Sequence, residues 1–215
     1  MYIYIGKSKI VKQFYRLILF VAVLASCTMH NTSIQLTGAI GNHAMVSSAH
    51  PMASAIGLEI LKNGGNAIDA AIATHFALAV VYPQAGNIGG GGFAVIRMND
   101  GTINSLDFRE KAPALAHREM YLNAKGQLND LQSTHGHMAS GVPGAVDGMF
   151  ALHQKYGTLP MAELIEPSIE MAQRGYALTP LVAELLNAKQ EQFQTYNRWS
   201  TPYPVSYTHL RAHET

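Results

Sequence analysis

The stretch Pro83-Gln84-Ala85-Gly86-Asn87-Ile88-Gly89-Gly90-Gly91-Gly92-Phe93 joins a very apolar segment to a predicted strand. Four consecutive glycines between two core-forming segments are not typical of a flexible linker. Glycine has no Cβ, so the run permits positive φ angles and a close approach of other backbone. The stretch therefore predicts a tight helix-to-strand passage that packs against another part of the chain.

The segment before the glycines, residues 67–81, is apolar almost all round, which predicts a buried helix. Asn66 is a favourable N-cap, and Asp69 lies in the first turn, where the helix dipole favours an anion. With about 15 residues and with Asp69 and His75 inside it, the helix is a poor membrane span. We interpret His75 as a hydrogen-bonded core histidine.

The remaining pattern predicts a mixture of helices with one hairpin. Residues 93–98 and 102–108 are predicted strands, and Asn99-Asp100-Gly101 between them is a strong hairpin signal. Prolines and glycines mark the ends of the other elements. The first of these are a strand at 43–48, a helix from Pro51 to the Gly64-Gly65 stop, and irregular chain at 110–139. A helix at 144–155 follows, and then a helical stretch from Pro160 that Pro167 kinks or restarts. The last helix begins at Pro180 and has Leu181, Leu185, Ala188 and Gln192 on one face.

Composition excludes several classes of protein. The chain has 215 residues with 48% hydrophobic and 13% charged side chains, which indicates a globular domain or part of one rather than a disordered segment. Its 15 basic and 14 acidic residues nearly cancel, so no basic stripe predicts a nucleic-acid partner. His135 and His137 are the only close histidine pair, with no cysteine or acid at zinc-like spacing, so no metal site is expected.

The N-terminus resembles an export signal. Four basic residues (Lys7, Lys9, Lys12 and Arg16) precede the apolar run Leu17–Ala25, and Ser26 precedes Cys27. We predict a lipoprotein-type signal at 1–26, lipid on Cys27 and a tether at 27–40, and hence a protein exported to the periplasm or cell envelope and anchored to the membrane. The alternative is an ordinary cleaved signal with a chance cysteine. A single cysteine forms no internal disulfide.

Arg109, in Asp107-Phe108-Arg109-Glu110, is the best candidate for binding a ligand. A planar guanidinium can form two parallel hydrogen bonds with a carboxylate, which suits the α-carboxylate of an amino acid. The residues alone favour a structural alternative, in which Arg109 pairs with Asp107 or Glu110. The glycine run itself lacks the order of a phosphate-binding or dinucleotide-binding loop.

Five motifs occur in a fixed order and carry a resemblance over about residues 45–199. They are Gly64-Gly65-Asn66-Ala67-Ile68-Asp69-Ala70-Ala71, the stretch 83–93, Asp107-Phe108-Arg109-Glu110, Ala139-Ser140-Gly141-Val142-Pro143-Gly144 and Lys155-Tyr156-Gly157. Together they resemble the N-terminal part of the large subunit of the gamma-glutamyltransferase (glutathione hydrolase) family.

The resemblance implies a fold and an activity. The fold class is α+β, part of the αββα sandwich of N-terminal-nucleophile hydrolases, incomplete in this chain. A proenzyme of this family cuts itself into a large and a small subunit. The freed N-terminal threonine attacks the γ-glutamyl amide of glutathione and related compounds, and the glutamyl group passes to water or to an amine. No cofactor is implied. The family's arginine that holds the α-carboxylate corresponds to Arg109.

The resemblance also implies that catalytic residues are absent here. No segment offers the family's threonine motif, and Ser133-Thr134-His135 lies within the large-subunit part. We expect residues 41–201 to be the N-terminal portion of the large subunit, 202–215 to be a non-native tail, and the small subunit to be the missing partner. The chain alone is expected to be inactive.

Two rival interpretations remain. The chain could be a lipid-anchored binding module that is not an enzyme. It could also belong to another amidohydrolase of the same superfamily, such as one that acts on acylated β-lactam precursors.

Overall fold

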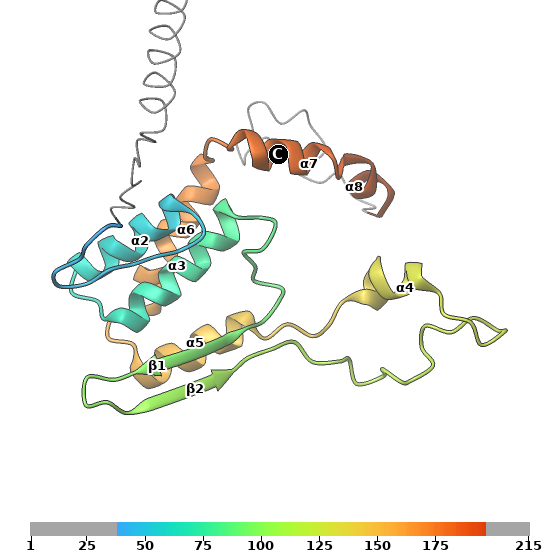
Figure 1. The fold of residues 1–215 in the computed structure, drawn as a ribbon, viewed down its shortest axis with the longest axis horizontal. Coiled ribbons are helices and arrows are strands. Elements are labelled where there is room, and N and C mark those ends of the chain that lie inside the picture. The colour runs from blue at the N-terminus through green and yellow to red at the C-terminus, as the bar shows by residue number, and fades with distance from the viewer. Residues whose placement is uncertain (1–37, 197–215) are drawn as a thin grey trace, which may run out of the picture. The chain divides into compact units, whose positions relative to one another are not determined.

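The structure is a computed structural model and describes residues 38–196 (Figure 1). The predicted signal, Cys27 and the predicted tail at 202–215 lie outside these residues. The elements are, in order, α2 (Pro51–Lys62), α3 (Ala67–Val81), β1 (Phe93–Arg97), β2 (Ile103–Asp107), α4 (Asp130–Thr134), the 3-10 helix η1 (His137–Ala139), α5 (Ala145–Tyr156), α6 (Met161–Arg174), α7 (Pro180–Asn187) and α8 (Gln190–Tyr196).

Helix α3 is the centre of the packing and contacts α2, α5 and α6. More than half of its residues are buried, and Ile72 and Val81 are completely inaccessible to solvent, whereas Ala67 and Ala71 are exposed. Figure 1 shows α2 and α6 beside α3 and shows α5 against the hairpin. The helix predicted at 67–81 is therefore confirmed, and its burial is confirmed with it.

The two strands form an antiparallel hairpin in which Phe93 pairs with Asp107 and Arg97 with Ile103. Because side chains alternate along a strand, the hairpin has two different faces. Ala94, Ile96 and Leu106 face the core, whereas Phe93 and Val95 are exposed. Helices packed on one face of an antiparallel sheet confirm the predicted α+β class.

Two apolar clusters hold the described residues together. The larger joins the hairpin to the helices through the buried residues Ile60, Ala70, Ile72, Ala73, Phe76, Ile96, Met149, Leu152 and Leu164. The smaller lies between α2, the end of α3 and α6 and consists of Ala53, Ala77, Val81 and Met171. A fully buried aliphatic side chain contributes roughly 1.5–3 kcal/mol, so the larger cluster dominates.

Two sequence predictions were wrong in detail, and a third is narrowed to one of its two alternatives. Residues 43–48 form no strand, because no strand among the described residues pairs with them. Of the kink or restart predicted at Pro167, the restart is excluded, because α6 runs through Pro167 as one helix. Proline removes one hydrogen bond, but Leu164, Ser168 and Met171 are buried on both sides of it, and this packing holds the helix. The segment 110–139, predicted as irregular, contains α4 and η1.

The last helix also differs from its prediction. It is divided, because α7 ends at Asn187 and α8 begins at Gln190. The buried residue of α7 is Val182, whereas Leu181 is 63% exposed. Thr179 caps α7 as expected, since its hydroxyl accepts a hydrogen bond from the Val182 amide.

Asp69 connects the start of α3 to the loop between α5 and α6. It is completely buried, and its carboxylate accepts hydrogen bonds from the Asn66 amide at 3.0 Å and from the Thr158 amide at 3.1 Å. The Thr158 hydroxyl also donates to it. Asn66 in turn donates from Nδ2 to the Tyr156 carbonyl at 2.6 Å. The predicted cap of α3 is confirmed and serves also as a tertiary clamp.

The hydrogen bonds of this clamp favour the ionised carboxylate. Burial would raise the pKa of Asp69, but the Thr158 hydroxyl and the amides of Asn66, Thr158 and Leu159 outweigh it and lower the pKa below its usual 3.8. A carboxyl with a lowered pKa in the folded state stabilises the fold fully above the unfolded-state pKa. That contribution is lost as the pH falls through the folded-state value.

We predict that Asp69→Asn lowers the free energy of unfolding by roughly 3 kcal/mol at pH 7, because an amide accepts fewer hydrogen bonds and leaves buried donors unpaired. Urea denaturation measures this. The difference from the native protein should shrink as the pH falls below 3.8. Glu184→Gln, on an exposed part of α7, is the control and should change stability little. An equal loss in both variants would contradict the clamp.

Candidate functional site

The segment Phe108–Glu110 leaves β2 between two glycine-rich stretches. On one side Phe108 pairs with Gly92, since its amide donates to the Gly92 carbonyl at 3.0 Å. On the other side Lys111 and Val142 exchange backbone hydrogen bonds of 3.0 and 2.8 Å. Three motifs that are separate in the sequence thus meet at one place.

The two glycine stretches also bind each other directly. The amides of Gly144 and Ala145, at the start of α5, both donate to the Gly90 carbonyl, at 2.8 and 2.9 Å. These amides belong to the first turn of a helix, where N–H groups have no partner within the helix. The Gly90 carbonyl therefore caps α5 and holds its N-terminus beside the strand ends.

The glycines are required because the backbones approach too closely for a side chain. A Cβ on Gly91 would lie 2.6 Å from the Phe108 oxygen and 2.7 Å from both Arg109 Cα and the Glu110 nitrogen. A Cβ on Gly144 would overlap the Phe108 carbonyl from the opposite side. The predicted close packing of the glycine run against other backbone is confirmed, and the other backbone is that of Arg109 and its neighbours.

Asn87 shapes the loop before the glycines. Its side-chain oxygen accepts a hydrogen bond from the Gly90 amide at 2.9 Å, and its backbone hydrogen-bonds to the imidazole of His75. Burial lowers the pKa of His75, and the bond to Asn87 opposes this only in part, so the imidazole is neutral at pH 7. His75 is the hydrogen-bonded core histidine that we expected, although Nε2 has no partner in the described part of the chain.

Arg109 is exposed beside these close contacts, with 63% of its side chain accessible. Its backbone amide donates to Asp107 Oδ1 at 2.9 Å. Its guanidinium lies with Nε 3.6 Å from Glu110 Oε2 and with Cζ 5.8 Å from the centroid of the Phe93 ring. Of the two structural partners that the sequence leaves open, Glu110 forms the ion pair, whereas Asp107 binds the Arg109 backbone.

The geometry leaves the guanidinium able to bind an anion. A separation of 3.6 Å is too long for a hydrogen bond, and exposed ion pairs contribute little to stability. The backbone of Arg109 is fixed on both sides, while its charged end projects from the hairpin. This arrangement suits a fixed receptor for a small carboxylate.

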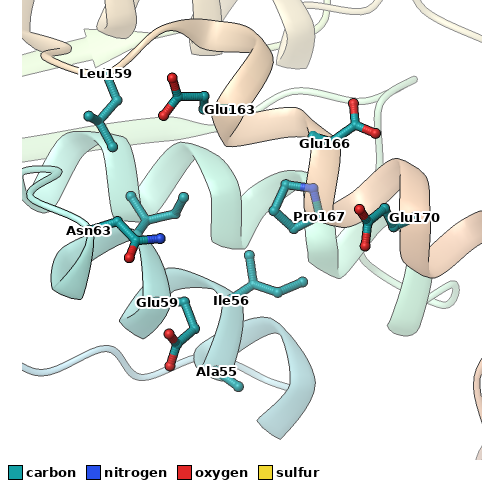
Figure 2. A pocket seen from close by; sticks show the side chains of 10 residues that line it. Ala55, Ile56, Glu59, Asn63, Leu159, Glu163, Glu166, Pro167 and Glu170 are labelled. Carbon is teal, nitrogen blue, oxygen red and sulfur yellow. The ribbon is translucent and has the colours of Figure 1, made fainter.

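A groove on another part of the described structure is lined by acidic side chains, in contrast to the basic Arg109 (Figure 2). This groove of about 530 Å³ runs between α2 and α6, and Ile56, Ile60 and Pro167 line it. Glu59, Glu163, Glu166 and Glu170 also belong to its lining. Because like charges repel, the groove is unsuited to a carboxylate ligand.

The other candidate residues serve local structure. Ser133 and Thr134 donate from their hydroxyl groups to the Asp130 carbonyl at 2.9 and 2.6 Å, so both are committed to the backbone of α4. Within residues 38–196 no cluster of three or more potential metal ligands occurs, and no helix is long and apolar enough to cross a membrane.

Comparison with known proteins identifies the family. A sequence profile described as Gamma-glutamyltranspeptidase matches residues 53–215. The chain belongs to the gamma-glutamyltranspeptidase family. It corresponds to the N-terminal part of the large subunit, and its fold is an incomplete part of an N-terminal-nucleophile hydrolase.

Individual relatives agree with this assignment. The glutathione hydrolase proenzyme of Pseudomonas sp. (strain A14) is 45% identical over 174 residues, which are 80% of this chain and 30% of that protein. The crystal structure of Helicobacter pylori gamma-glutamyltranspeptidase superposes with a TM-score of 0.72 at 49% identity, covering 74% of this chain and 46% of that one. The acylase ACY 1 proenzyme of Pseudomonas sp. (strain SE83) is 41% identical over 154 residues, 69% of this chain and 28% of that protein.

The chain thus spans about a third of the length of these curated relatives.

The sequence predicted Arg109 and all three motifs that surround its backbone, but it did not predict the pairing of Gly144 with Gly90 or the position of the Phe93 ring. The glycines of the stretches 83–93 and 139–144 could have indicated this contact, because glycine permits two backbones to approach closely.

We predict that Gly91→Ala destabilises the protein by about 1–3 kcal/mol, because the new methyl group must displace the backbone of Arg109 or Glu110. Gly89→Ala is the matched control, since a Cβ there meets nothing within 4 Å and its φ is not positive. Thermal melting of the two variants measures the difference. Equal melting temperatures would show that the contact at Gly91 is not close enough to matter.

Proposed function

We propose that this chain is part of a γ-glutamyl hydrolase or transferase that cleaves the γ-glutamyl amide of glutathione and related compounds. The observation that carries the proposal is Arg109. Its backbone is fixed by the glycine stretches, while its guanidinium is exposed and has only a distant ionic partner among residues 38–196. A guanidinium held in this way fits the α-carboxylate of the glutamyl group.

The rest of the reaction is proposed to require residues beyond this chain. In the scheme that the family implies, a threonine freed by self-cleavage attacks the amide carbonyl, and its own α-amine accepts the hydroxyl proton. The resulting acyl-enzyme passes the glutamyl group to water or to an amine. The described residues then contribute recognition of the substrate, and the chain alone has no turnover.

An acylase activity is the second candidate, and the 41% identity to an acylase proenzyme favours it. The two activities differ in what Arg109 must bind, since a γ-glutamyl donor always carries an α-carboxylate next to the amine. Profiling the full-length protein with γ-glutamyl anilides and with acylated β-lactam nuclei separates them. Exclusive turnover of the second class would reject the γ-glutamyl proposal.

We predict that Arg109→Lys in the full-length protein raises KM for a γ-glutamyl anilide about 10- to 100-fold. Lysine keeps the charge but loses the planar pair of donors, and a hydrogen bond to a charged group contributes roughly 1.5–3 kcal/mol. The effect should fall on KM rather than kcat, because the α-carboxylate lies away from the bond that breaks. Self-cleavage should continue, since it needs no glutamate.

Arg97→Lys is the matched control for this substitution, because Arg97 is an exposed arginine on the same hairpin. It should leave KM unchanged. If Arg109 is instead a structural partner of Glu110, Arg109→Lys should lower the melting temperature and leave KM nearly unchanged. Kinetics and melting of one preparation distinguish the two roles.

We further propose that the protein is exported and anchored to the cell envelope through lipid on Cys27. The support is the sequence pattern alone: a basic region, an apolar run of nine residues and a small residue before the cysteine. A single lipid-modified cysteine at the new N-terminus would place the enzyme at the membrane surface.

Mass spectrometry of the membrane-associated protein tests this. The expected result is a mature protein that begins at Cys27 and carries lipid, and Cys27→Ala should release the protein from the membrane fraction. Cleavage at another position with a free thiol on Cys27 would reject the anchor and leave the activity proposal untouched.

A further inference from the structure

We propose that Phe93 is a positioning residue for the carboxylate receptor: its ring holds the Arg109 guanidinium so that the paired N–H donors remain available to the substrate. This inference rests on the proposed function, because it assigns a supporting side chain to the same site. It starts from the position of Arg109 Cζ, 5.8 Å from the centroid of the Phe93 ring.

The backbone determines which side of the hairpin each residue occupies. Phe93 pairs directly with Asp107 across the ladder, so the two side chains lie on the same face. Arg109 follows two residues after Asp107, and the period of two returns its side chain to that face. The neighbouring pair, Phe108 and Gly92, is hydrogen-bonded and fixes the register. The contact between ring and guanidinium is thus set by the pairing of the strands.

Phe93 lies on the face of the hairpin that the described helices leave uncovered. The side chain is 65% exposed at the end of β1, while Ala94 and Ile96 supply the face that packs against the core. A cation within about 6 Å of the face of an aromatic ring is attracted by the ring's quadrupole. The Phe93 ring therefore attracts the guanidinium of Arg109, the residue that binds the ligand in the proposed function.

An aromatic support suits this task better than an acidic one. A carboxylate in contact with both terminal nitrogens would occupy the donors that the substrate needs. A ring attracts the cation through its face and leaves the N–H groups in the guanidinium plane free. The nearby acids are arranged accordingly: Asp107 binds the Arg109 backbone, and Glu110 approaches only to 3.6 Å from Nε.

The test compares two competitive inhibitors of the full-length protein, glutamate and isoglutamine, which differ only in having an α-carboxylate or an α-carboxamide. Phe93→Leu should weaken inhibition by glutamate about 5-fold and leave inhibition by isoglutamine unchanged, since an exposed cation–π contact has roughly that strength. Phe93→Trp retains an aromatic face and should keep glutamate inhibition at or above the native level. Val95→Ala, on the same exposed face, is the control and should change neither constant.

A double-mutant comparison separates this inference from the proposed function. In an Arg109→Lys background, Phe93→Leu should have little further effect on glutamate, because the guanidinium that the ring supports is gone. Equal weakening of both inhibitors by Phe93→Leu, or a full 5-fold effect in the Arg109→Lys background, would overturn the role of Phe93. If Arg109→Lys itself does not discriminate glutamate from isoglutamine, the proposed function fails instead.

Discussion

The close approach of the glycine run to the backbone of Phe108 and Arg109 is the constraint on which the site depends. Gly91 on one side and Gly144 on the other leave no space for a side chain. Closely packed interiors do not yield to an added methyl group without a shift of their neighbours. The position of the Arg109 backbone is therefore set by van der Waals contact, and only its charged end is free to respond to a ligand.

Helices α3 and α5 position the glycine run against the backbone of Arg109. Helix α3 is fixed at its start by the Asp69 clamp to the loop after α5, and from the middle of the helix His75 bonds to Asn87, which shapes the glycine turn. The N-terminus of α5 is bound to Gly90. Both helices that contact the glycine motifs are thus positioned by polar groups with defined geometry, while the apolar cluster supplies most of the stability.

The sequence predicts the elements with strong local signals. The cap at Asn66, the buried helix at 67–81 and the hairpin at Asn99-Asp100-Gly101 are confirmed, because each depends on residues close together in the chain. The strand at 43–48 was wrong, and the choice between a kink and a restart at Pro167 stayed open, because pairing partners and tertiary packing decide them. Likewise, Arg109 could be found from its motif, but its aromatic neighbour follows from strand register, which composition does not reveal.

The central claim is that the fixed arginine recognises an α-carboxylate. A crystal structure of the full-length protein with bound glutamate tests it most directly. The account predicts two hydrogen bonds of about 2.7–2.9 Å from the Arg109 guanidinium to the α-carboxylate, with the glycine contacts of its backbone unchanged. Glutamate bound elsewhere, with Arg109 still beside Glu110, would contradict the account.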